Sequence, residues 1–141
     1  VLLRPLVPLA AIALLVAAQG FTQGVARTTA DGVYTTQQAN EGRELWASAC
    51  NNCHTPHNGL PFKNKWIGRD LASLFAYVKN EMPKNDPGGL SDEEYLLAVA
   101  FLVRANGMPA GERPLPMDSL ALSRIRFDSV RTVPTSTGPR R

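Results

Sequence analysis

The chain of 141 residues contains only two cysteines, Cys50 and Cys53, and His54 follows the second one directly. The surrounding stretch reads SACNNCHTP. Two thiols at this spacing can serve a redox disulfide, a disulfide staple, a zinc site or the covalent attachment of haem. Each chemistry predicts different surroundings, so the rest of the sequence can separate them.

Three of the four chemistries fit the surroundings poorly. A redox C-x-x-C pair is expected just after a strand, whereas the residues before Cys50 have helical periodicity. A disulfide between these cysteines would close so short a loop that it would stabilise the fold little. Zinc could use Cys50, Cys53, His54 and His57, but structural zinc sites usually take their ligand pairs from two separated segments.

The fourth chemistry accounts for the histidine as well as the cysteines. C-x-x-C-H is the attachment signature of c-type haem. The thiols add across the two vinyl groups of the porphyrin, and the histidine beside the second thiol is then held under the iron as its proximal ligand. The sequence therefore predicts one covalently bound haem c on Cys50 and Cys53, with His54 as an iron ligand.

The first 18 residues are typical of a secretory signal peptide. Arg4 precedes an apolar run of 13 residues, from position 6 to 18, which ends in small side chains. A bilayer span needs roughly 20 apolar residues, so a permanent membrane helix is the weaker interpretation. We expect cleavage after Ala18 and a periplasmic or secreted protein, with membrane contact only through an uncleaved signal peptide.

The remaining sequence divides into a linker, one domain and an extension. Residues 19–34 are rich in Gly and Thr and predict a flexible linker. Residues 35–112, the predicted domain, hold seven Lys and Arg against nine Asp and Glu. Residues 113–141 form a Pro- and Arg-rich extension whose end is predicted to be disordered, although 119–127 can form one helical turn or lie against the domain. A net charge of only +3 argues against nucleic acid as a partner.

Three helices are predicted within the domain, and no segment shows strand alternation, so the fold class is all-α. They lie in the stretches 35–50, 70–83 and 91–107. The third carries Ser91 and Glu94 at capping-box spacing, and Pro83 stops the second. Three helices of this size cannot bury a large core alone, and a buried macrocycle would supply the missing apolar contact.

The second iron ligand is predicted to be a methionine. Met82 lies between the second and third helices, and Pro83 disfavours the α-helical region for it, so its thioether can turn away from the helix. Met108 is the second candidate, whereas His57 is too near His54 to reach the opposite haem face. The alternatives are a core methionine at a helix end and an open sixth site.

The region from Gly42 to Gly111 resembles the class I cytochromes c, specifically the single-haem exported type found as a partner or fused domain of bacterial dehydrogenases. The resemblance rests on Gly42 and Trp46 ahead of CNNCH, then on KWIGRDLASLFAYVKNEMP and GGLSDEEYLLAVAFLVRANGMPAG, in the family's order. It implies a cytochrome c fold of three main helices and loops around one haem. It also implies that the first and last helices cross at Gly42 against Phe101.

The resemblance implies roles for three more residues. Pro61 resembles the position whose carbonyl accepts the N–H of the proximal imidazole, a bond that orients the ring. Trp66 and Arg69 resemble positions that bond the haem propionates. Their ordinary interpretations are a loop proline, a packed indole and a solvated charge. The extension from Leu115 onward departs from the minimal family pattern.

These features together predict an electron-transfer protein without substrate chemistry of its own. Its partners would be redox proteins: a dehydrogenase as donor, and an oxidase or another cytochrome as acceptor. A methionine ligand favours ferrous iron and predicts a potential above zero. Four lysines surround the predicted ligand loop in sequence and either steer an acidic partner or form a solvated face: Lys63, Lys65, Lys79 and Lys84. The alternative functions are a haem subunit of a quinoprotein or molybdenum dehydrogenase complex, an open-site haem enzyme or gas-binding protein, and a non-haem metal-binding module.

Overall fold

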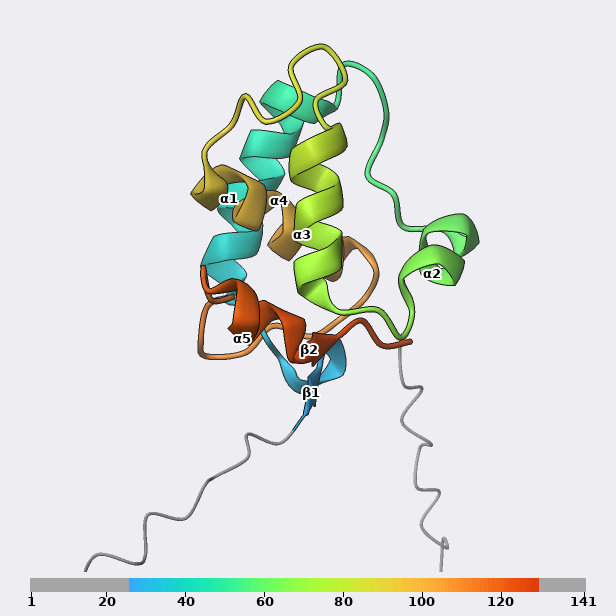
Figure 1. Ribbon diagram of the computed structural model, residues 1–141, viewed down its shortest axis with the longest axis vertical. Coiled ribbons are helices and arrows are strands. Elements are labelled where there is room, and N and C mark those ends of the chain that lie inside the picture. The colour runs from blue at the N-terminus through green and yellow to red at the C-terminus, as the bar shows by residue number, and fades with distance from the viewer. Residues whose placement is uncertain (1–25, 130–141) are drawn as a thin grey trace, which may run out of the picture.

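The computed structural model of the chain describes residues 26–129 (Figure 1). In chain order its elements are β1 (Arg27–Thr28), the 3-10 turn η2 (Thr29–Asp31), α1 (Thr36–Leu45), the π-helical turn η3 (Trp46–Cys50), α2 (Leu60–Trp66), α3 (Leu71–Glu81), α4 (Asp92–Ala105), α5 (Ser119–Ser123) and β2 (Ile125–Arg126). The fold is mostly helical, with α1 to α4 as its main helices. The predicted signal peptide and the predicted disordered end lie outside the described residues.

The three predicted helices are confirmed, and their capping residues explain where they start. The Thr35 hydroxyl accepts a backbone N–H of the first turn of α1 at 3.1 Å. The Asp70 carboxylate accepts one from α3 at 2.8 Å. Ser91 and Glu94 form both bonds of the capping box of α4. These side chains satisfy N–H groups that have no partner within the helix.

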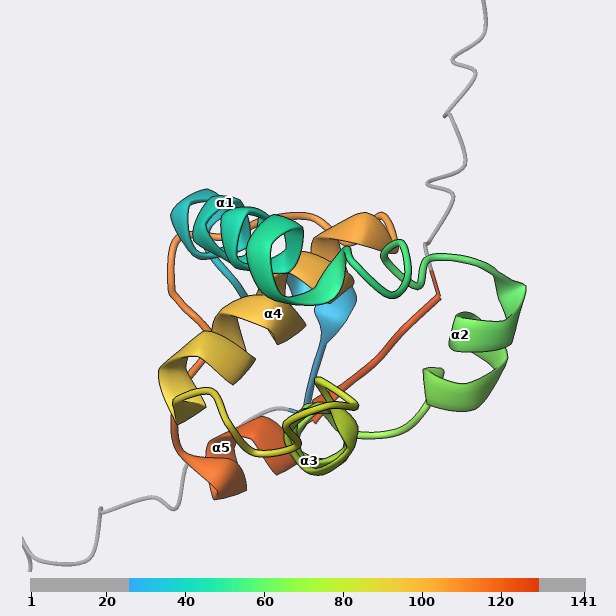
Figure 2. The ribbon, with the colours of Figure 1, turned by 90° about the horizontal axis from the view of Figure 1, so that it is seen from above.

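The helix α2 was not predicted. It has seven residues, and Gly59 at its N-cap makes no side-chain capping bond. Two turns are too few to show a clear helical periodicity, and a helix this short is marginal without tertiary contacts. Figures 1 and 2 show α2 standing apart from α1, α3 and α4.

The tightest helix crossing joins α1 to α4 at Gly42. A Cβ atom added to Gly42 would lie 2.0 Å from the Leu97 carbonyl oxygen and 3.0 Å from the Cβ of Phe101. Only glycine permits so close an approach between the two helices. The predicted crossing at Gly42 against Phe101 is therefore confirmed, and the backbone of Leu97 is the nearer contact.

The segment that was predicted to be a flexible linker contributes to the fold in its described part. β1 pairs in parallel with β2, and Thr29 and Val33 are buried. The Tyr34 carbonyl accepts the Gly111 N–H at 2.7 Å. The prediction was wrong for residues 26–34, because their partners lie near the far end of the described chain and leave no local signal.

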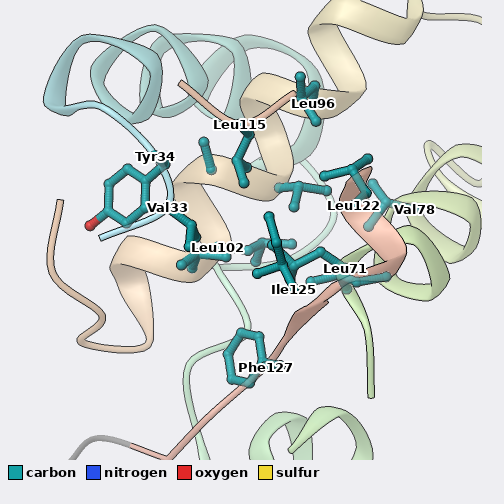
Figure 3. Packing of buried hydrophobic residues seen from close by; sticks show 14 of the residues in the cluster. Val33, Tyr34, Leu71, Val78, Leu96, Leu102, Leu115, Leu122, Ile125 and Phe127 are labelled. Carbon is teal, nitrogen blue, oxygen red and sulfur yellow. The ribbon is translucent and has the colours of Figure 1, made fainter. Parts of the chain in front are cut away.

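The first part of the predicted extension also packs onto the domain. Figure 3 shows Leu122, Ile125 and Phe127 within the same cluster of side chains as residues of α3 and α4. The Phe127 N–H donates to the Arg69 carbonyl, and the Phe127 carbonyl accepts the Gly68 N–H, both at 2.8 Å. The sequence left a helical turn and packing against the domain as alternatives, and both are present, since α5 is that turn.

Replacing Gly42 with Ala should lower the free energy of unfolding by about 3 kcal/mol, because the added methyl group must push α1 away from the backbone of α4. Chemical denaturation of the purified protein measures the change. Gly59→Ala is the control, since a Cβ there meets only Pro61 at 3.5 Å, and it should cost less than about 1 kcal/mol. Equal stability of the two variants would contradict the tight crossing.

Candidate functional site

The two cysteines and His54 lie where the first helix ends. α1 continues into η3, in which the Asn51 N–H donates to the Trp46 carbonyl at 2.9 Å. This wider turn carries the chain to Cys50 and then into the turn that holds Cys53 and His54. Single π-helical turns within helices are frequent at functional sites.

The geometry around these side chains does not match a disulfide or a zinc site. Cys50 is partly buried, Cys53 is exposed, and both are free. Across residues 26–129, no three His, Cys, Asp or Glu side chains are grouped so that they could hold a metal ion. Burial, and to a smaller extent Cys53, raises the pKa of the Cys50 thiol. A redox-active C-x-x-C pair needs a lowered thiol pKa instead.

A mainly apolar cavity of about 240 Å³ lies beside the motif. Cys50, Cys53, His54 and Met82 all line it. Its walls include large apolar and aromatic side chains from η3, α2, α3 and α4: Trp46, Phe62, Trp66, Leu74, Tyr77 and Leu102. The fold therefore brings both thiols, the imidazole and the thioether to one cavity, although Met82 is distant from the motif in sequence.

The His54 ring has a defined position beside this cavity. Its Nδ1 lies 3.0 Å from the Thr55 carbonyl oxygen. The ring packs edge-on against Trp46, at 5.5 Å between centroids, and stacks on His57 at 4.6 Å. Because a carbonyl accepts only from a protonated Nδ1, this contact leaves the lone pair of Nε2 for a metal.

The His54 ring is bonded to a different carbonyl from the one that the resemblance implied. The resemblance gave the Pro61 carbonyl as acceptor of the imidazole N–H, whereas the structure pairs His54 Nδ1 with the Thr55 carbonyl. Pro61 lies in the first turn of α2 and lines the cavity. A role for Pro61 toward haem stays a prediction.

The backbone of Met82 fits the predicted role of second ligand. Met82 follows the last residue of α3 in an extended conformation, with φ −136° and ψ 149°, and its N–H donates to the Val78 carbonyl at 3.0 Å. Its side chain is half-buried and lines the cavity. Met108 is 3% exposed and is not among the residues that line the cavity. The geometry thus favours Met82 over Met108.

Trp66 and Arg69, the predicted propionate contacts, lie together at the end of α2. The Arg69 guanidinium is 4.6 Å from the centroid of the Trp66 ring. Trp66 is buried and lines the cavity, whereas Arg69 is exposed and does not line it. Their contact with propionates stays a prediction.

A second cation–π contact at the same cavity, beside that of Arg69 with Trp66, was not predicted from the sequence. The Lys65 Nζ lies 3.6 Å from the centroid of the Tyr77 ring, and both residues line the cavity. Lys65 belongs to α2 and Tyr77 to α3. No spacing rule relates the two, because α2 itself was not predicted.

Two buried polar atoms near the motif lack a hydrogen bond, Nε1 of Trp46 and Oδ1 of Asn106. Trp46 lines the cavity, and leaving a buried N–H unpaired costs about 1–3 kcal/mol. A group bound in the cavity could offset that cost. Together with the two thiols, a free imidazole nitrogen, a thioether and apolar walls, this donor set fits haem c.

Comparison with known families agrees with the site. Residues 37–102 match the family model described as cytochrome C oxidase, cbb3-type, subunit III. No curated protein and no solved structure gives a significant match to the chain. Residues 37–102 are a cytochrome c domain, and with the C-x-x-C-H motif and the His54 and Met82 pair this indicates covalently bound haem c. The domain implies electron transfer through haem and redox proteins as partners.

In the part of the chain that the structure describes, no helix has both the length and the apolar character that a membrane crossing requires.

Replacing both Cys50 and Cys53 with Ala should abolish covalent haem attachment, because no thiol is left to add to the vinyl groups. The measurement is haem staining and intact mass after export in a host with haem-attachment machinery. Ser48→Ala is the control, since its hydroxyl bonds only carbonyls of its own helix. If haem stayed bound to the double variant during acidic organic extraction, its covalent attachment through Cys50 and Cys53 would be contradicted.

Proposed function

We propose that this protein is an exported, single-haem electron carrier that moves one electron at a time from a dehydrogenase to a downstream acceptor. The observation that carries the proposal is the shared cavity of His54 and Met82. Two protein ligands occupy both axial positions of an iron, so no position is left for a substrate. We therefore expect the residues of this site to serve electron transfer and not catalysis.

Each proposed site residue has a separate task. Cys50 and Cys53 would hold the haem through thioether bonds, and His54 and Met82 would bind its iron. When bound, the haem supplies an iron that alternates between the ferric and ferrous states. The methionine sulfur favours the ferrous state and thus a potential above zero.

Pro61, Trp66 and Arg69 complete the proposed haem contacts. The position of Pro61 and Trp66 in the cavity lining supports their proposed contact with haem. For Arg69 the support is less direct, because its guanidinium contacts Trp66 and not the cavity.

Partners are proposed to dock where the cavity reaches the surface. Lys65 and Lys84 line the cavity, but Lys84 is paired with Glu81 in an exposed ion pair. Because Glu81 partly neutralises Lys84, Lys65 attracts an acidic partner more strongly than Lys84 does. Weak electron-transfer contacts usually bury less than about 1,200 Å², and steering by lysines makes their rates fall as salt rises.

A second candidate is a haem subunit of a larger oxidoreductase complex, such as a quinoprotein or molybdenum dehydrogenase. It is favoured by the match to a family that is described as an oxidase subunit. Purification under mild conditions discriminates the two. A carrier is recovered alone, whereas a subunit is recovered with a larger enzyme chain.

Met82→Leu should remove the weak far-red band of the ferric protein that reports sulfur bound to iron, because leucine cannot bind iron. The reduced variant should bind carbon monoxide, and its potential should fall. Absorption spectra and a redox titration measure these changes. Met108→Leu is the matched control, and it should keep the band, since Met108 lies outside the cavity lining.

Two other outcomes would contradict the ligand assignment. If the band disappeared in Met108→Leu and persisted in Met82→Leu, Met108 would be the ligand. If the unsubstituted protein had no band and bound carbon monoxide when reduced, the site would be open, and the haem enzyme or gas-binding protein would be the better interpretation.

A further inference from the structure

The hydroxyl of Tyr95 connects the two ends of the loop that begins at Met82. It donates to the Met82 carbonyl at 2.8 Å and accepts the Leu90 N–H at 3.4 Å. The backbone of the loop between these residues is otherwise bonded by two tight turns, from Pro83 to Asp86 and from Asp86 to Gly89, and the exposed side chain of Lys84 pairs with Glu81. Tyr95 is thus the side chain that ties both ends of the loop to the body of the fold.

Both the backbone and the side chain of Tyr95 have fixed contacts. It lies in the first turn of α4, where its N–H donates to the Ser91 carbonyl at 3.0 Å. Its side chain is 0% exposed, and its ring packs edge-on against Phe75 of α3 at 6.5 Å between centroids. A buried ring with a fixed backbone leaves its hydroxyl a single position, so the carbonyl that it bonds is held in place as well.

The backbone of Met82 is therefore restrained from both sides. Its N–H is bonded to Val78 within α3, and its carbonyl is bonded to Tyr95 of α4. The half-buried side chain between these two bonds lines the cavity. A movement of the loop that carries the backbone of Met82 away from the cavity must break the bond to Tyr95.

We propose that Tyr95 is the positioning residue of the sixth iron ligand: its buried hydroxyl holds the Met82 loop closed and thereby keeps competing ligands off the iron. This inference rests on the proposed role of Met82 as that ligand. A foreign ligand would replace the Met82 sulfur only while the loop carries that sulfur away from the iron, so its apparent affinity would be proportional to the open fraction. Loss of the Tyr95 bond raises that fraction.

The chain offers a matched control in Tyr34. Tyr34 is also buried, and its hydroxyl donates to a methionine carbonyl, that of Met108, at 2.7 Å. Neither Tyr34 nor Met108 lines the cavity. Tyr34→Phe thus removes the same kind of bond and costs similar overall stability, without touching the Met82 loop.

The test compares Tyr95→Phe with Tyr34→Phe in the haem-loaded, full-length protein. Phenylalanine keeps the ring and its packing, so only the hydroxyl is lost. Imidazole titrated into the ferric protein displaces the sulfur, and the loss of the far-red band reports its binding. We expect Tyr95→Phe to raise the affinity for imidazole about three- to tenfold, the range of one typical hydrogen bond, and Tyr34→Phe to change it less than twofold.

A double variant separates ligand positioning from simple access to the cavity. Met82→Leu has no sulfur to displace, and its imidazole binding can be followed at the main absorption band of the haem. Adding Tyr95→Phe to Met82→Leu should change its affinity less than twofold. An increase as large as that in the single Tyr95→Phe variant would overturn the proposal, because Tyr95 would then control only entry into the cavity.

The remaining outcomes distinguish this inference from the proposed ligand. If Met82→Leu loses the band while Tyr95→Phe and Tyr34→Phe have the same imidazole affinity, Met82 is the ligand and Tyr95 is only a packed core residue. If Met82→Leu keeps the band, the ligand assignment itself is wrong, and the inference about Tyr95 fails with it.

Discussion

The direct contact between α1 and α4 at Gly42 is the constraint on which the rest of the site depends. Because no side chain separates Gly42 from the Leu97 carbonyl, the two helices have essentially one relative placement. α1 continues through η3 into the cysteine motif, and α4 carries Tyr95 in its first turn and Asn106 just past its end. The crossing therefore fixes where the motif lies relative to both ends of α4.

The side chains at these two ends of α4 hold the two loops that carry the proposed iron ligands. At its start, the Tyr95 hydroxyl bonds the Met82 carbonyl at 2.8 Å. Beyond its end, the Asn106 Nδ2 donates to the carbonyl of His57, three residues after His54, at 2.9 Å. Both bonds come from buried side chains on one rigid element, so the spacing between the loops is set by the length of α4. Bonds from packed side chains on a rigid element are the kind of support that holds a site in a defined geometry.

The sequence was sufficient where the signals are local. Helical periodicity, with a capping box in the third helix and Pro83 after the second, predicted three helices. C-x-x-C-H predicted the haem, and Pro83 predicted the extended backbone of Met82. The sequence did not predict α2, which is too short to show periodicity. Nor did it predict β1, because this strand pairs with one near the far end of the described chain. The sequence placed Tyr95 only within the third predicted helix, at 91–107, because its bond to Met82 depends on the relative placement of α3 and α4, which no spacing rule contains.

The part of the chain beyond the matched residues 37–102 also shapes the cavity. α2 stands apart from the other main helices, yet its Phe62 and Trp66 form part of the cavity wall. Phe62 packs against Phe127 at 5.6 Å between ring centroids, and Phe127 is 1% exposed and bonded to both Gly68 and Arg69. A short helix without such contacts is marginal in water. The segment after α4 therefore supports α2 together with Tyr77 of α3, which packs against Trp66 at 5.4 Å between ring centroids. It contributes to the wall of the cavity even though the thiols, the imidazole and the thioether all lie within the matched domain.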